Sequence, residues 1–114
     1  MNTVSIQPLS ADVSVAPQLD ASAMAQLAQA GFKSVINNRP DFEGGPSQPT
    51  SAQIEAAALA AGLQYVHLPV AGAYQSPEEI ARFGELLQSL PKPLLAFCRS
   101  GARSTRLYQA ASAA

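Results

Sequence analysis

The sequence holds a single cysteine, a single histidine and no tryptophan, and only 13% of its residues are charged. One cysteine excludes an internal disulfide, and no group of histidine, cysteine and acidic residues has metal-ligand spacing, so we expect no metal and no other cofactor. A net charge of −1 without a basic block argues against a nucleic-acid-binding surface. The sequence has no apolar run of the roughly 20 residues that cross a bilayer and no secretory signal pattern. We therefore expect a cytoplasmic protein that binds no membrane.

The sequence does contain enough apolar residues for a core. Hydrophobic residues make up 47% of the 114 positions, which suits one compact domain over residues 1–114. Their periodicity predicts strands over 4–8, 13–16, 32–37, 63–70 and 94–98, and helices over 20–29, 51–61, 76–90 and 103–113. Strands that alternate with helices predict an α/β fold, with a mostly parallel central sheet flanked by helices.

The only cysteine ends the last predicted strand and begins a short polar loop. Cys98 is followed by Gly101 within this loop and by Arg103, where the last helix starts. Amides of such a loop, together with the helix dipole, attract an anion and lower the pKa of a cysteine placed there. The guanidinium of Arg103 is suited to bind an oxyanion with two N–H groups. A lone cysteine is usually a small buried hydrophobic residue, but this setting favours Cys98 as the nucleophile of an enzyme.

The remaining loop residues are candidates for binding the anion. We expect Arg99 at the rim of the pocket, where it adds positive field, and Gly101 at a backbone position that needs its freedom. The backbone around Ala102 contributes amides to the anion cradle. Ser100 and Ser104 are placed to donate hydrogen bonds to the sulfur or the anion, although helix capping explains Ser104 equally well.

Other chemistry-bearing residues follow neighbouring predicted strands, and ligands bind at the carboxyl ends of strands in such sheets. Arg39 and Asp41 follow one strand and are candidates for the pocket. Asp41 is the nearest substitute for a general acid, but pairing with Arg39 or capping a turn explains it somewhat better, and Glu43 is a weaker candidate. His67, inside a strand, fits a structural role better than a catalytic one. Tyr74 fits a pocket wall and an ordinary surface position about equally well.

Three segments together resemble a small bacterial family, the phosphatase-like domain of beta-lactamase hydrolase-like proteins. These segments are residues 31–43, 62–70 and 97–104, and the resemblance covers roughly 13–107. It implies the fold of protein tyrosine and dual-specificity phosphatases, with Cys98 as nucleophile and Arg103 as the anion-binding arginine. It places Arg39 and Asp41 in a loop that borders the site. It also implies a partner, a metallo-beta-lactamase-like hydrolase of sulfur metabolism.

The sequence departs from the phosphatase pattern at three places. Four residues separate Cys98 from Arg103, whereas phosphatases have five and rhodanese-type sulfurtransferases have four. Phe97 stands where phosphatases usually have histidine. The loop 71–75, where phosphatases carry an aspartate general acid, contains no acidic residue. Loss of general-acid help typically costs about 10²–10⁴-fold in rate.

Three functions therefore stay open at the level of sequence. The first is a phosphatase-like hydrolase that cleaves phosphate esters through a covalent intermediate on Cys98. The second is a rhodanese-type sulfurtransferase that carries a persulfide on Cys98, a reaction with no alkoxide to protonate. The third is a non-catalytic anion-binding module. The first two imply a small anionic substrate, either phosphorylated or a persulfide.

Overall fold

The computed structural model of the protein describes residues 5–113. Its strands are β1 (Gln7–Pro8), β2 (Val13–Ala16), β3 (Ser34–Asn37), β4 (Gln64–His67) and β5 (Leu94–Phe97). Its helices are α1 (Ala21–Gln29), α2 (Ser51–Ala60), α3 (Pro77–Ser89) and α4 (Ala102–Ala113). The strands form one sheet in the order β1-β2-β5-β3-β4, in which only the β1–β2 pair is antiparallel. The predicted α/β fold with a mostly parallel sheet is confirmed.

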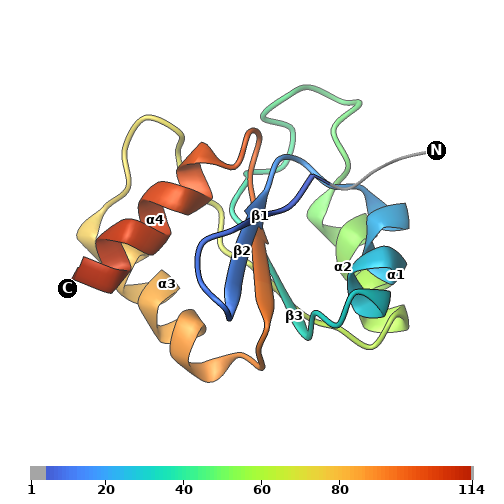
Figure 1. Ribbon diagram of the computed structural model, residues 1–114. Coiled ribbons are helices and arrows are strands. Elements are labelled where there is room, and N and C mark those ends of the chain that lie inside the picture. The colour runs from blue at the N-terminus through green and yellow to red at the C-terminus, as the bar shows by residue number, and fades with distance from the viewer. Residues whose placement is uncertain (1–4, 114) are drawn as a thin grey trace.

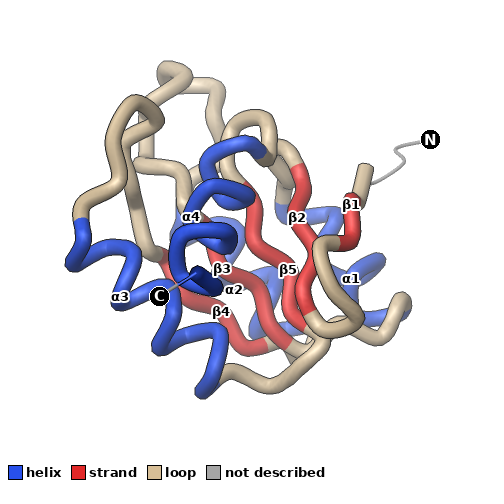
Figure 2. Tube along the Cα trace, turned by 60° about the vertical axis from the view of Figure 1, so that its left-hand side comes forward, coloured by secondary structure: helices blue, strands red, loops and turns tan. Residues whose placement is uncertain are grey.

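Helices cover both faces of the sheet. Figure 1 shows α1 and α2 together on one side and α3 and α4 together on the other, and α4 crosses in front of the strands in Figure 2. The two core clusters follow this division, because one gathers Met24, Leu27 and Ile54 and the other gathers Phe83, Leu86 and Leu107. Such a two-sided arrangement is typical of a parallel sheet, whose strands are buried on both faces.

The central strand, β5, is the most deeply buried part of the chain. Its four residues are each 0% exposed, and it pairs with β2 on one side and β3 on the other. Leu95 and Phe97 point toward the α1–α2 cluster, whereas Leu94 and Ala96 point toward the α3–α4 cluster. The residue that follows this strand, Cys98, therefore starts from a rigid position.

Local sequence signals explain most element boundaries. Thr50 and Ser76 each form a capping box at the start of a helix, with Gln53 and Glu79 as the reciprocal partners. The strand predicted over 63–70 is shorter and ends at His67, before Pro69. The amides on either side still donate to the neighbouring segment, from Leu68 to Asn37 and from Val70 to Asn38.

Further boundaries differ from the predictions, since the strand predicted over 32–37 begins at Ser34 and the one predicted over 94–98 ends at Phe97. The strand predicted over 4–8 contains only two strand residues, Gln7–Pro8, and Val4 lies outside the described residues. The last helix begins one residue earlier than predicted, at Ala102. Between residues 5 and 113, none of the helices combines the length and the apolar character needed to span a membrane.

Candidate active site

Cys98 lies at the carboxyl end of β5, where a tight loop leads into α4. The loop turns at Gly101, whose φ of +94° lies in the region that favours glycine. This conformation directs the Gly101 amide at the sulfur, and the N···Sγ distance is 3.1 Å. The amide of Gln18 holds the loop from outside by donating to the carbonyl of Arg99 at 3.1 Å. The loop thus turns the Gly101 amide toward the sulfur, and Cys98 itself is buried.

The surroundings of Cys98 favour its thiolate form. Burial raises the pKa of the thiol, whereas hydrogen bonds from the amide and hydroxyl of Ser104 and from the amides of Gly101 and Ser100 lower it. The hydrogen bonds outweigh burial, so the pKa lies below the ordinary value of 9.0. A lowered thiol pKa is the property that a nucleophilic cysteine needs at neutral pH.

Ser104 divides its hydrogen-bonding capacity between the sulfur and a buried asparagine. Its hydroxyl donates to Oδ1 of Asn38 at 2.8 Å, and Nδ2 of Asn38 donates to the carbonyl of Leu68 at 3.0 Å. Because a hydroxyl has one hydrogen, this contact leaves the backbone amide of Ser104 as its standing donor toward Cys98. The Ser104 hydroxyl can donate to the sulfur only by leaving Asn38.

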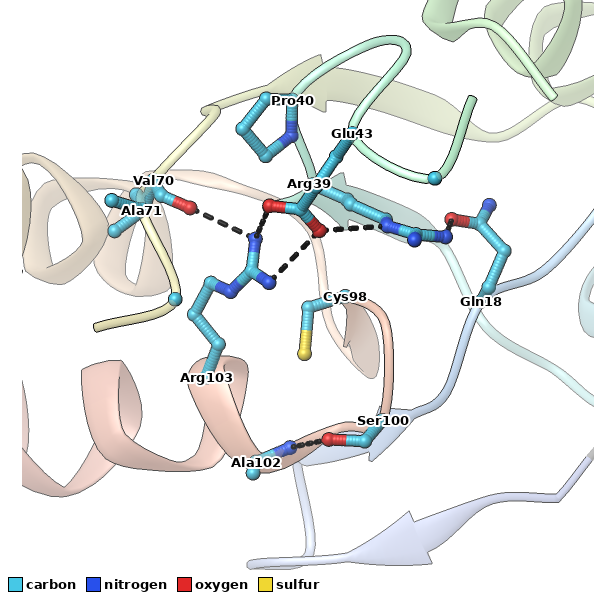
Figure 3. A network of polar contacts seen from close by, with 12 residues as sticks. Gln18, Arg39, Pro40, Glu43, Val70, Ala71, Cys98, Ser100, Ala102 and Arg103 are labelled. Atoms are coloured by element: carbon cyan, nitrogen blue, oxygen red, sulfur yellow. Dashed lines mark hydrogen bonds and ion pairs between the residues drawn. The ribbon is translucent and has the colours of Figure 1, made fainter. Parts of the chain in front are cut away.

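Arg103 is buried at the start of α4, with part of its guanidinium engaged. Nη1 donates to Val70 O at 2.9 Å and to Glu43 Oε2 at 3.1 Å, and Nη2 donates to Glu43 Oε1 at 3.1 Å. Nε is buried and has no hydrogen-bond partner among residues 5–113. Figure 3 shows the Nε–Nη2 edge turned away from Glu43 and toward the loop that carries Cys98. An N–H donor in this position is available to an anion bound at the cysteine.

The loop 71–75 closes against Arg103 without adding a side chain to the site. A Cβ on Gly72 would lie 3.2 Å from Nη2 of Arg103, so glycine permits this close approach. Nη2 of Arg106 donates to the carbonyl of Gly72 at 2.7 Å and ties the loop to α4. Tyr74, on the same loop, is 66% exposed. The loop therefore supplies packing to the arginine and no proton donor to a leaving group.

Glu43 enters the site from the loop that follows β3. Its carboxylate accepts from Arg103 and also from Nε of Arg39, at 2.9 Å. The hydrogen bond from Arg103 lowers the pKa of Glu43, burial opposes this effect, and Arg39 adds to it, so the net pKa lies below the ordinary 4.5. An ionised carboxylate in this state has no proton to donate, which removes Glu43 as a general acid near neutral pH.

Sequence reasoning ranks Glu43 below Asp41, whereas the structure places Glu43 in the site. The reason is a turn at Phe42, whose φ of +64° is unusual for a residue other than glycine. The Glu43 amide bonds back to Pro40 O at 3.4 Å, and the carboxylate reaches Arg103, 60 positions away in the sequence. No local sequence pattern predicts a left-handed backbone at a phenylalanine, so the sequence contains no signal for the contact between Glu43 and Arg103.

The two residues predicted for this border differ in their placement. Arg39 is buried beside the site, and its Nη1 donates to Gln18 Oε1 at 3.1 Å. Asp41 instead accepts from the Ser51 amide at 2.8 Å at the start of α2, which is the capping role that the sequence also allows. His67 bonds through Nε2 with the carbonyl of Arg39 at 2.9 Å and so supports the loop.

The remaining predicted residues lie around the loop. Arg99 is exposed at the rim, and Ser100 Oγ accepts from the Ala102 amide at 3.3 Å. A surface depression is lined by Arg39, Glu43, Gly44, Arg99 and Arg103. Its three arginines outnumber its one carboxylate, so the depression attracts anions. Among the described residues, no group of three histidine, cysteine or acidic side chains is placed to hold a metal ion.

Comparison with known proteins agrees with this architecture. The family described as beta-lactamase hydrolase-like protein, phosphatase-like domain, matches residues 5–114. The chain is 38% identical over 106 residues to a beta-lactamase hydrolase-like protein of Agrobacterium fabrum, covering 93% of this chain and 22% of that protein. A beta-lactamase hydrolase-like protein of Xylella fastidiosa is 33% identical over 96 residues, covering 84% of this chain and 22% of its own length. The chain thus spans about a fifth of the curated relatives that it matches.

Solved structures extend the comparison to the fold. The crystal structure of a "putative phosphatase" from Neisseria meningitidis superposes with a TM-score of 0.83 and 36% identity, covering 90% of this chain and 72% of that one. Beyond this family, a structure of Tk-PTP shares the fold at a TM-score of 0.70 and 17% identity, covering 93% and 77%. The expected likeness to cysteine phosphatases is confirmed at the level of fold. With its sequence matched by the family over residues 5–114, this chain belongs to the phosphatase-like domain family of beta-lactamase hydrolase-like proteins.

Proposed function

We propose that this domain is a cysteine-dependent, phosphatase-like hydrolase that acts on small phosphate esters. The observation that carries the proposal is the buried, unpartnered Nε of Arg103, which faces the loop of Cys98 while Nη1 and Nη2 are bound to Glu43. Nε and the second hydrogen of Nη2 form a two-donor edge suited to one oxyanion. The loop amides supply the other donors, and the thiolate supplies the nucleophile.

In the proposed reaction, the Cys98 thiolate attacks phosphorus as the ester P–O bond breaks and the leaving oxygen departs with the electron pair. Water then attacks the phosphocysteine, the P–S bond breaks, and phosphate leaves with the thiolate restored. Arg103 and the loop amides hold the equatorial oxygens in both steps. Loop 71–75 carries no acid, Glu43 is ionised and Asp41 caps α2. We therefore expect efficient turnover only for esters with good leaving groups.

A second candidate is a rhodanese-type sulfurtransferase, which the four-residue spacing between Cys98 and Arg103 favours. In this reaction the thiolate attacks the outer sulfur of thiosulfate, the S–S bond breaks, and sulfite leaves with the electron pair. The resulting persulfide on Cys98 passes its outer sulfur to an acceptor thiolate. Sulfite is a weakly basic leaving group that needs no proton, so the missing general acid is no handicap to this chemistry.

One experiment separates the two reactions. The protein is incubated with thiosulfate and analysed by intact mass spectrometry, and in parallel with an aryl phosphate whose release is followed by absorbance. Because Cys98 is the only cysteine, an added sulfur atom assigns itself to that residue. Phosphate release that is lost in Cys98→Ser supports the hydrolase. A transferable sulfur without phosphate release supports the sulfurtransferase, and neither activity leaves the non-catalytic anion-binding module.

We further propose that this domain works with a metallo-beta-lactamase-like hydrolase. The proposal draws on the relatives, of which the chain covers only 22%. The hydrolase would either consume the product of the Cys98 reaction or supply its substrate. The test measures turnover of the hydrolase after wild-type or Cys98→Ser protein is added. Equal turnover in the two cases would contradict this coupling.

A further inference from the structure

The carboxylate of Glu43 occupies a site made by two arginines. It takes both terminal nitrogens of Arg103, at 3.1 Å each, and Nε of Arg39 at 2.9 Å. This is the fork geometry with which guanidinium groups bind carboxylates. Figure 3 shows the carboxylate between the two guanidinium groups, with the Cys98 sulfur below them. A carboxylate-binding position therefore lies directly beside the proposed anion cradle.

The arginine side of this position is firmly built. Arg39 is 8% exposed, and its Nη1 donates to Gln18. Its amide donates to Asn37 Oδ1 at 2.9 Å, and His67 bonds with its carbonyl. A Cβ on Gly44 would lie only 2.6 Å from Nη2 of Arg39, so a side chain at this position would have to displace the guanidinium. Such support is unusual for an arginine that merely neutralises a surface glutamate.

Glu43, which occupies this position, is held less firmly than the two arginines. The Glu43 side chain is 29% exposed, and it follows Phe42, whose left-handed backbone is unfavourable for a large side chain and whose ring is 64% exposed. The turn that delivers the carboxylate thus carries strain that is released when the turn opens. A ligand carboxylate would replace Glu43 with the same donors and the same charge.

We propose that the Arg39–Arg103 pair is a carboxylate subsite, closed by Glu43 in the free protein and opened by substrates that bear a carboxylate as well as the reacting anion. The proposal names the substrate class of the proposed function and rests on that function for the position of the reacting group. The reacting anion takes the Nε edge of Arg103, and the ligand carboxylate takes the edge that Glu43 vacates.

The test compares two phosphonates that the protein cannot hydrolyse, 3-phosphonopropionate and propylphosphonate, by titration calorimetry. They differ in one carboxylate. We expect wild-type protein to prefer 3-phosphonopropionate by about tenfold, because the ligand carboxylate takes over the bonds of Glu43 while the strained turn at Phe42 relaxes. In Glu43→Ala the competitor is gone, and the preference should widen to about a hundredfold. Glu85→Ala removes a carboxylate from the exposed Arg82–Glu85 pair and should behave as wild type.

Two variants distinguish a subsite that depends on the geometry of Arg39 from a general attraction of the ligand carboxylate to positive charge. Arg39→Lys keeps the charge but loses the geometry, and the tenfold preference should largely disappear. Arg99→Gln removes a rim charge and should leave most of the preference in place. The wild-type comparison stands even where Glu43→Ala fails to fold.

Each remaining outcome decides against a defined part of the proposal. Equal binding of the two phosphonates by wild type and Glu43→Ala overturns the subsite while leaving the cradle intact. Weaker binding of both ligands by folded Glu43→Ala protein also overturns it, since Glu43 would then only position Arg103. Failure of every variant to bind either phosphonate would reject the anion cradle itself, and with it the proposed function.

Discussion

The hydroxyl of Ser104 donates to Oδ1 of Asn38, 66 positions earlier in the chain, although Ser104 also borders the Cys98 sulfur. This contact joins the end of β3 to the first turn of α4. It gives Ser104 two roles, one in the stability of the fold and one in the ionisation of the thiol.

Replacing Ser104 with alanine should affect both roles. Asn38 Oδ1 would lose its donor in a fully buried position, which typically costs about 1–3 kcal/mol of stability. The thiol pKa should rise, because alanine has no hydroxyl that could turn from Asn38 to the thiolate. Chemical denaturation and the pH dependence of Cys98 alkylation measure the two effects. Ser100→Ala, at an exposed position of the same loop, is the matched control and should keep wild-type stability.

The Cys98 thiol should titrate below its ordinary value of 9.0. Its alkylation rate should therefore reach a plateau at lower pH than that of a free cysteine. Since the folded pKa lies below the unfolded one, ionisation stabilises the fold fully above pH 9, and this stabilisation is lost as the pH falls through the folded pKa. As the pH falls from 9 through the folded pKa, wild type should therefore lose stability relative to Cys98→Ser. A rate that keeps rising through pH 9 would contradict the lowered pKa.

Glu43→Gln should lower stability at neutral pH by on the order of 1–2 kcal/mol, because charge-assisted bonds to two arginines are lost from a partly exposed group. The pKa of Glu43 is lowered from 4.5, so its contribution is present above pH 4.5 and is lost as the pH falls through the folded pKa. Denaturation of the two proteins at pH 7 and at pH 3 should give curves that converge at the lower pH. A constant difference would show that the charge of Glu43 is not responsible.

Phe42→Gly should stabilise the protein by up to about 1 kcal/mol. Glycine removes the cost of a left-handed backbone, roughly 1–2 kcal/mol, and adds back part of it as chain entropy. The exposed ring loses little burial. The midpoint of urea denaturation measures the gain, with Leu59→Ala as a control at another exposed apolar residue. A destabilised Phe42→Gly would mean that the ring packs against the loop.

Asp41→Asn should leave turnover unchanged if Asp41 only caps α2. The asparagine oxygen still accepts from Ser51, so stability should fall by no more than about 0.5 kcal/mol. The check is kcat for an aryl phosphate at several pH values. A loss approaching a hundredfold would instead establish Asp41 as the acid that loop 71–75 lacks.

The parts of this molecule that sequence predicts best are those whose partners are close in the chain. The β5–loop–α4 segment runs without interruption from Leu94 to Ser104, so one apolar run, one glycine and one arginine are enough to outline the cradle. Helix starts at Thr50 and Ser76 follow from caps three residues from their partners. Such features depend on local rules that tertiary packing does not override.

The parts that sequence misses depend on contacts between distant segments. The pair formed by Glu43 and Arg103 spans 60 positions and requires an unfavourable turn at Phe42. The close approaches of Gly44 to Arg39 and of Gly72 to Arg103 depend on how two loops meet. Composition and periodicity describe each loop separately, so only the assembled sheet shows that both loops reach Arg103.

The burial of β5 has a consequence for how this thiol is exposed to reagents. A strand whose residues are 0% exposed and paired on both sides opens only when the whole domain opens. Cys98 itself is buried next to this strand, so bulky alkylating reagents should reach it only when the domain unfolds, whereas small anionic ones should enter along the arginines. Alkylation of the single cysteine can therefore measure two properties. Bulky reagents report on unfolding of the domain, and small anionic reagents report on access to the native site.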